Sequence, residues 1–288
     1  MSEPSTSLNK IINARYPGLT NKGKLLAEFV LSNPDKAVFM TTRELAAAVG
    51  TSEATVIRFV RQLDYPSYPL FIKAVKNLID TELTLIERNR MAMPVIQSED
   101  AEFERIIWQD IENIKALTQQ IDLDEVKKVK KLLKDAKSIH IIGSRLSYSP
   151  AFYMGWTLAK VRPHVEILKG SDRTTIDRLT LAGHKTAVVV IATSRYPNEL
   201  IKIGKHAKRL KHKLVLLTDS TACPLVPFSD HALVSPLKAI PFLGSPASLI
   251  SLINYLVHSL ASDMGDALKS HQERLEQAYL ENDILFNY

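Results

Sequence analysis

The most constraining feature of the sequence is the stretch 41–63, TTRELAAAVGTSEATVIRFVRQL, in which two short helical patterns flank one glycine. A T-x-x-E capping box opens the first pattern, and apolar residues at helix spacing carry it to residue 49. Gly50 follows directly, where helices commonly end in a left-handed residue, and Ser52 is placed to cap the second helix. The stretch therefore predicts two short helices joined by a tight turn.

The second predicted helix has an apolar side, formed by Val56, Phe59 and Val60, and a polar side that ends in arginines. This arrangement is typical of a helix-turn-helix, whose second helix enters the major groove of DNA. Short polar groups and Arg58 would contact base edges, and Arg61 would contact phosphate. The predicted DNA-binding residues are Thr42, Ser52, Glu53, Thr55, Arg58 and Arg61. A helical hairpin inside a larger helical domain is the alternative.

Composition limits the classes of protein that the chain can belong to. Its 288 residues, 45% of them hydrophobic, predict two domains with ordinary cores. A net charge of +6 permits a polyanionic partner but is weak support alone. One cysteine, Cys223, and no Cys/His cluster predict a cytoplasmic protein without metal or cofactor. The most apolar stretch, 240–261, is interrupted by Gly, Pro and polar residues, which predicts a buried or interface helix and no membrane partner.

Periodicity divides the chain. Helical patterns surround the central motif, and they fade where charge mixes with methionine and proline. The predicted division is an all-α helix-turn-helix DNA-binding domain at 1–86, a linker at 87–104 and a second domain at 105–288.

In the second domain, short Ile- and Val-rich runs alternate with segments of helical length. The runs are residues 138–143, 165–168, 186–192, 214–218 and 231–234. Buried strands that alternate with helices predict a parallel sheet in a three-layer α/β domain. Such sheets bind ligands beyond the carboxyl ends of their strands, at helix N-termini.

The loops after the first and third of these strands are rich in hydroxyls, and each carries an arginine. Exposed amides, positive helix ends and arginines together favour an anion. The predicted ligand-binding residues are Gly143, Ser144, Arg145, Ser147, Thr193, Ser194, Arg195 and Asn198. The alternative is that the serines and threonines are ordinary helix caps.

The combination resembles the RpiR family of bacterial transcriptional regulators, which join an N-terminal helix-turn-helix domain to a C-terminal sugar isomerase (SIS) domain. The resemblance rests on the A-x-x-x-G-x-S-E-A-T-V-x-R-F core and on the segments IHIIGSRLSYSPA, IATSRYPNELI and LTDSTACPLVPFSDHAL. It implies a regulator, not an enzyme, that forms a homodimer or homotetramer. It also implies that the SIS domain senses a phosphorylated sugar and changes the affinity of the linked domain for DNA. Two recognition helices would then meet a double-stranded operator with two-fold symmetry.

The sequence departs from the SIS patterns G-x-G-x-S and S-x-S-G-x-T in the loops that would hold the ligand. Arg145 replaces the second glycine of the first pattern, while Ser147 keeps its serine. In the second pattern, Ser194 is kept, and Ala192, Arg195 and Pro197 replace serine, glycine and threonine. Losing a glycine can close the tight backbone approach that a phosphate needs.

Three interpretations remain open. The arginines can replace amide contacts by charge-assisted ones, so that the ligand is still a sugar phosphate or a related anion. The site can instead be filled, so that the SIS domain only dimerises. The third is a sugar-phosphate isomerase with an accessory helical domain, for which Glu199, His164 and His231 are the candidate acid/base residues.

Overall fold

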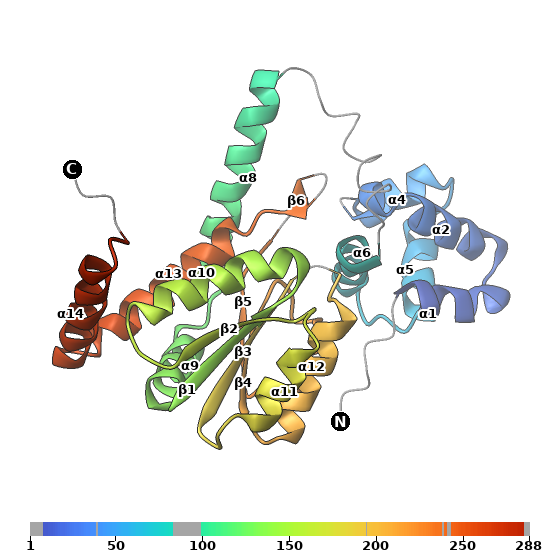
Figure 1. The fold of residues 1–288 in the computed structure, drawn as a ribbon. Coiled ribbons are helices and arrows are strands. Elements are labelled where there is room, and N and C mark those ends of the chain that lie inside the picture. The colour runs from blue at the N-terminus through green and yellow to red at the C-terminus, as the bar shows by residue number, and fades with distance from the viewer. Residues whose placement is uncertain are drawn as a thin grey trace. The chain divides into compact units, whose positions relative to one another are not determined.

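A computed structural model of the protein describes residues 8–38, 40–82, 99–193, 195–237, 239–240 and 243–284. The chain divides into two compact units, 1–95 and 96–288 (Figure 1). Most of the predicted linker, 87–104, falls outside the described residues. Helix α8 begins at Glu99, so the C-terminal end of the predicted linker is helical and not irregular. The predicted domain boundaries otherwise stay predictions.

The first unit is helical throughout its described part, as predicted. Its helices are α1 (Leu8–Arg15), α2 (Asn21–Ser32), α3 (Pro34–Ala37), α4 (Thr42–Ala48), α5 (Glu53–Gln62) and α6 (Tyr68–Glu82), with a 3-10 turn, η1, at Tyr16–Gly18. The short α3 begins at Pro34, and proline is well suited to a first helical position because its missing amide hydrogen is not needed there. The core includes Leu26, Leu45 and the edge-to-face pair of Phe59 and Phe71, whose ring centroids are 5.9 Å apart.

The second unit is an α/β domain built on a five-stranded sheet. Its strands and helices are α8 (Glu99–Gln120), α9 (Leu123–Asp135), β1 (Ser138–Gly143), α10 (Tyr148–Ala159), β2 (Val165–Lys169), α11 (Thr174–Leu181), β3 (Thr186–Ala192), α12 (Asn198–Arg209), β4 (Lys213–Thr218), β5 (His231–Val234), β6 (Ala239–Ile240), β7 (Leu243–Gly244), α13 (Ala247–Ser262) and α14 (Asp266–Glu281). Two 3-10 turns, η3 (Arg145–Ser147) and η4 (Val226–Phe228), lie between them. All five predicted strands are confirmed.

The sheet order is β2-β1-β3-β4-β5, and all its neighbouring pairs are parallel. Every residue of β3 is buried, as a central strand covered on both faces requires. Ile141 and Val189 face a core with α9, α10 and α13, whereas Ile142 and Val190 face a core with α11 and α12. The alternation of side chains along each strand thus produces the predicted three layers (Figure 1).

The apolar stretch 240–261 is less uniform than its composition suggested. Its first residues enter a small antiparallel pair, β6 with β7, and the helix begins only at Ala247. Leu249, Ile253 and Leu256 of α13 are buried in the core beneath the sheet, which agrees with the predicted buried helix. Within the described residues, no helix combines the length and apolar character that a membrane crossing requires.

The central strands create the place where a ligand site is expected. β1 and β3 are parallel neighbours, yet α10 leaves β1 over one face of the sheet and α12 leaves β3 over the other. The chain therefore changes direction between these two strands. A crevice at such a point, beyond the carboxyl ends of the strands, is the usual ligand position in open α/β sheets.

Candidate functional site

The turn between α4 and α5 has the predicted geometry. Thr41 and Glu44 form both bonds of the capping box, and Gly50 has a positive φ of 64°. The amide of Thr51 donates to the carbonyl of Ala46 at 2.8 Å, which closes the end of α4. A side chain at position 50 would be strained in this conformation. The glycine therefore fixes the angle between the two helices.

Helix α5 is amphipathic in the predicted sense. Its apolar residues, Val56, Phe59 and Val60, are buried in the core of the unit. On its other side, Arg58 and Arg61 are exposed. The remaining predicted DNA-binding residues are also accessible: Ser52 and Glu53 are exposed, and Thr42 and Thr55 are partly exposed.

Four of the six predicted DNA-binding side chains bond to one another. The Ser52 hydroxyl caps α5 by accepting from the Thr55 amide at 3.3 Å, and it lies 2.9 Å from the Thr55 hydroxyl. The Thr42 hydroxyl donates to a Glu53 carboxylate oxygen at 2.6 Å, which ties α4 to α5. Arg58 and Arg61, by contrast, have no hydrogen-bond or ion-pair partner in the described part of the chain. The arginines are therefore the groups on this face that are available for an outside partner.

In the second unit, the predicted ligand loop after β1 bonds to helix α12, which follows the predicted ligand loop after β3. Ser144 is buried, and its hydroxyl donates to Oε1 of Glu199 at 2.7 Å. Nε of Arg145 lies 3.5 Å from the same oxygen. The hydrogen bond from Ser144 and, to a smaller extent, the charge of Arg145 hold the pKa of Glu199 below its ordinary value. Glu199 belongs to the first turn of α12, directly after Asn198.

The two loops also meet through their hydroxyls. Oγ of Ser147 lies 3.0 Å from Oγ1 of Thr193, and it accepts from the Thr193 amide at 3.1 Å. Both residues are buried. The predicted juxtaposition of the loops after β1 and β3 is therefore present. Ser194, another predicted ligand-binding residue, lies outside the described residues.

Arg145 and Arg195, which stand where the SIS patterns have glycine, adopt a backbone conformation that is unusual for residues with a side chain. Their φ angles are 53° and 55°, in the left-handed region that favours glycine. Gly143 is retained for a different reason, since a Cβ there would lie 2.3 Å from the Ser147 carbonyl oxygen. The two loops therefore each contain a strained arginine, and the arginines add positive charge where the patterns have glycine.

The candidate acid/base residues of an isomerase are not gathered at these loops. His164 precedes β2 and His231 is the first residue of β5, so both lie at the amino ends of parallel strands, opposite the loops. Nδ1 of His231 lies 2.8 Å from a carboxylate oxygen of Glu125. Of the three candidates, Glu199 alone lies beside the loops after β1 and β3.

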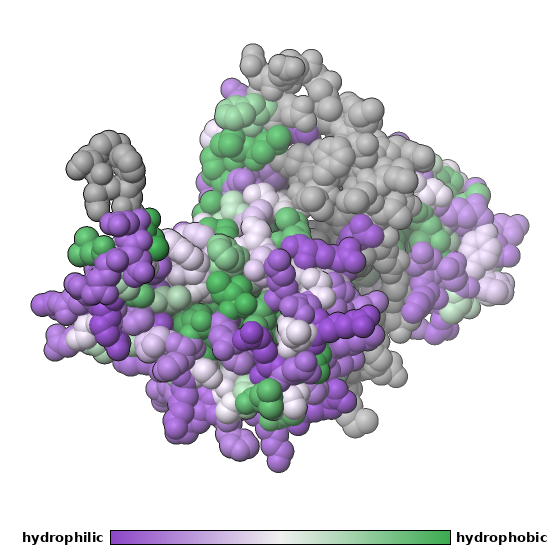
Figure 2. Space-filling view, viewed as in Figure 1, coloured by the Kyte–Doolittle hydropathy of each residue, from purple (hydrophilic) through white to green (hydrophobic). Residues whose placement is uncertain are grey.

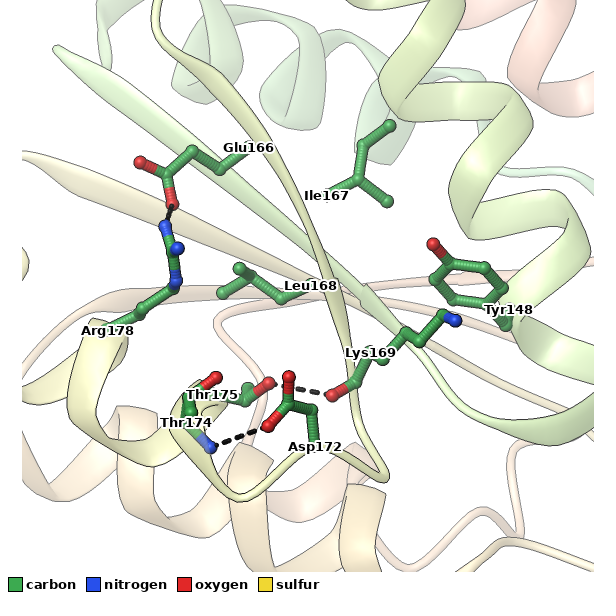
Figure 3. Close-up of a pocket in the computed structure, with 9 residues that line it drawn as sticks. All are labelled: Tyr148, Glu166, Ile167, Leu168, Lys169, Asp172, Thr174, Thr175 and Arg178. Carbon is green, nitrogen blue, oxygen red and sulfur yellow. Dashed lines mark hydrogen bonds and ion pairs between the residues drawn. The ribbon is translucent and has the colours of Figure 1, made fainter.

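A cavity of about 340 Å³ lies beside the first loop, at the carboxyl end of β2, and none of its lining residues is among the predicted ligand-binding residues (Figure 3). Nζ of Lys169 lies 5.2 Å from the centroid of the Tyr148 ring, and Arg178 pairs with Glu166 at 3.2 Å. The lining residues are Tyr148, Glu166, Ile167, Leu168, Lys169, Asp172, Thr174, Thr175 and Arg178. The sequence feature that could have indicated this cavity is the loop GSDRT at 170–174, which also connects a strand to a helix and carries hydroxyls.

No group of three or more His, Cys, Asp or Glu side chains suited to a metal ion occurs within the described ranges.

Comparison with known proteins identifies both units. The family model described as "Helix-turn-helix domain, rpiR family" matches residues 6–80, and the SIS domain model matches residues 132–262. The chain belongs to the RpiR family. It is an RpiR-type helix-turn-helix regulator with a SIS domain, which confirms the predicted family and fold class.

Relatives of this RpiR chain share its layout. An uncharacterized HTH-type transcriptional regulator of Clostridium perfringens is 24% identical over 227 residues, which is 78% of this chain and 80% of the relative. NanR of Vibrio vulnificus, solved in complex with ManNAc-6P, is 19% identical with a TM-score of 0.61, covering 97% of this chain and 100% of NanR. The sugar isomerase domain of an RpiR transcription factor from Sphaerobacter thermophilus is 19% identical with a TM-score of 0.58, covering 60% of this chain and 97% of that domain. The structural likenesses support the fold.

Proposed function

We propose that this RpiR-family chain is a cytoplasmic regulator that binds operator DNA through the exposed side of α5. An anionic metabolite of the sugar-phosphate class, bound between the loops after β1 and β3, would change that affinity. The observation that carries the DNA-binding half is the pair of exposed arginines, Arg58 and Arg61, which have no partner among the described residues and lie on a helix whose other side is buried.

The electrostatics of α5 suit a duplex. Guanidinium groups pair with guanine acceptors in the major groove or with phosphate oxygens. The hydrogen bond from Thr42 to Glu53 supports the proposal in another way, because it holds α4 against α5 and so fixes the direction in which the arginines project. Ser52 and Thr55 lie near the N-terminal end of the helix, where side chains of recognition helices reach base edges.

Replacing Arg58 tests the DNA-binding half. Arg58→Ala should weaken binding to an operator duplex recovered by selection by about 1–3 kcal/mol, if its guanidinium pairs with a base. Fluorescence anisotropy at fixed salt measures the change. Arg274→Ala, which removes an exposed arginine from α14, is the matched control for net charge and should leave the affinity unchanged. Equal affinities for all three proteins would remove Arg58 from the interface.

The anion-binding half rests on the loops that the fold brings together. Buried hydroxyls, the start of α12 and two arginines lie at the change of chain direction between β1 and β3. The complex of NanR with ManNAc-6P supports a phosphorylated sugar as the class of effector. Binding would act on the DNA-binding units through the predicted linker, by changing their separation or angle.

A thermal-shift screen of phosphorylated sugars on the full chain tests this half. A ligand at one hundred times its Kd should stabilise the folded state by about 2.7 kcal/mol. Melting curves that do not move with any anion would favour the alternative in which the SIS domain only dimerises.

We further propose that the SIS unit is not catalytic. Two of the three candidate acid/base residues, His164 and His231, lie at the far ends of their strands, and the relatives are named as transcriptional regulators. Turnover of a sugar phosphate in a coupled isomerase assay would contradict this part of the proposal.

The assembly that we propose is a homodimer or a homotetramer on a two-fold operator. Phe152 and Trp156, four residues apart on α10, have exposed fractions of 49% and 53%. Exposed apolar side chains gather over α10 and over α8 (Figure 2). Aromatic residues of this kind are enriched where subunits meet, which supports a second copy as their partner.

A further inference from the structure

We propose that Glu199 occupies the place of the effector's anionic group, so that only an anion of higher charge, such as a phosphate monoester, displaces it. This inference rests on the proposed function, because it assumes that an anion binds between the loops after β1 and β3. It assigns Glu199 a role that selects among anions.

The contacts of Glu199 are those expected for a bound anion. Its Oε1 accepts from the buried Ser144 hydroxyl at 2.7 Å and lies 3.5 Å from Nε of Arg145. These two loop residues were predicted to hold the ligand. The carboxylate also lies in the first turn of α12, where the helix dipole favours negative charge. A hydroxyl, a guanidinium and a helix N-terminus therefore already act on a carboxylate of the chain itself.

A tethered carboxylate makes the site selective for charge. A carboxylic acid from solution carries one negative charge, as Glu199 does, and it lacks the advantage of being attached to the protein. A phosphate monoester carries about −1.5 to −2 charges at pH 7 and three strong acceptor oxygens. The monoester therefore gains more from Ser144 and Arg145 than Glu199 does, whereas the carboxylic acid does not.

Protonation does not release Glu199 near neutral pH. Its pKa is held below the ordinary value, chiefly by the Ser144 hydrogen bond, so the carboxylate stays charged. The effector must therefore break the bond between Ser144 and Glu199. Because Leu200 beside Glu199 is buried in the core below α12, release of the carboxylate acts directly on the start of that helix.

The decisive variant is Glu199→Gln, which keeps an acceptor for Ser144 and removes the charge. Inorganic phosphate and acetate are titrated against the full chain in thermal-shift assays at constant ionic strength and pH 7.5. The wild type should be stabilised by phosphate and not by acetate. In Glu199→Gln, the midpoint for phosphate should fall about tenfold, the size of a lost charge-assisted hydrogen bond, and acetate should begin to stabilise. Glu112→Gln, which changes an exposed glutamate of α8, should behave as the wild type.

Each other result counts against the proposal. If phosphate binds the wild type and Glu199→Gln equally, or binds the variant more weakly, Glu199 is only a structural clamp and the proposed effector site survives. If phosphate stabilises neither protein, the proposed function fails together with this inference.

Should Glu199→Gln fold poorly by circular dichroism, Glu199→Asp replaces it. Its shorter side chain keeps the charge but withdraws from Ser144, so a smaller gain in phosphate affinity is expected, and no gain would again overturn the proposal.

Discussion

The strained arginine at position 195 allows a direct test of the loop geometry. Its φ of 55° lies in the left-handed region, which costs a residue with a side chain about 1–2 kcal/mol. Arg195→Gly removes that cost, but glycine makes the unfolded chain more flexible, which costs about 0.4–1 kcal/mol. The middle of the two ranges predicts a net gain of about 0.8 kcal/mol. For a domain of this size, the Tm should then rise by about 1–4 °C.

Two matched variants separate conformation from charge in differential scanning calorimetry. Arg173→Gly removes an exposed arginine whose φ is −63°, so no strain is relieved and the Tm should fall. Arg195→Ala removes the charge but keeps the Cβ, and it should melt close to the wild type. A fall in Tm for Arg195→Gly that matches the fall for Arg173→Gly would refute the assignment of strain to position 195.

Two further predictions concern the helix-turn-helix unit and the assembly. Thr41→Ala should destabilise the first unit by about 1 kcal/mol in urea unfolding, because the α4 cap loses its side-chain acceptor. The backbone amide of Thr41 donates to the Glu44 carboxylate and holds its pKa below the ordinary 4.5. The stability that this bond contributes is therefore complete above pH 4.5 and should be lost as the pH falls through the lowered pKa. Glu44→Gln should remove this pH dependence of unfolding. Phe152→Glu should shift the chain toward monomer in sedimentation velocity, whereas Leu181→Glu, the same kind of change at an exposed residue of α11, should not; an unchanged mass for Phe152→Glu would exclude α10 from the interface.

Local patterns predicted the elements well because local interactions decide them. The α4–Gly50–α5 turn depends on one cap, one glycine and one apolar stripe, all readable within 41–63. The strands were equally clear, since both faces of the central β3 are covered and its sequence is apolar throughout.

Contacts between distant segments could not be read in the same way. The bond from Ser144 to Glu199 depends on the parallel register of β1 and β3 and on the first turn of α12, which no local pattern encodes. The substitution of glycine by Arg145 suggested a closed loop, yet the arginine adopts the left-handed conformation. The cavity beside Lys169 was missed because the expectation was limited to two of the strand–helix loops.

The divergence of α10 and α12 from adjacent strands has a mechanical consequence. A small molecule that bridges their first turns touches helices from both layers at once, although the sheet separates the bodies of those layers. Sliding of one helical layer against the other would then break contacts with the molecule. A ligand bound at this edge would therefore stiffen the contact between the two helical layers, including the exposed aromatic surface of α10.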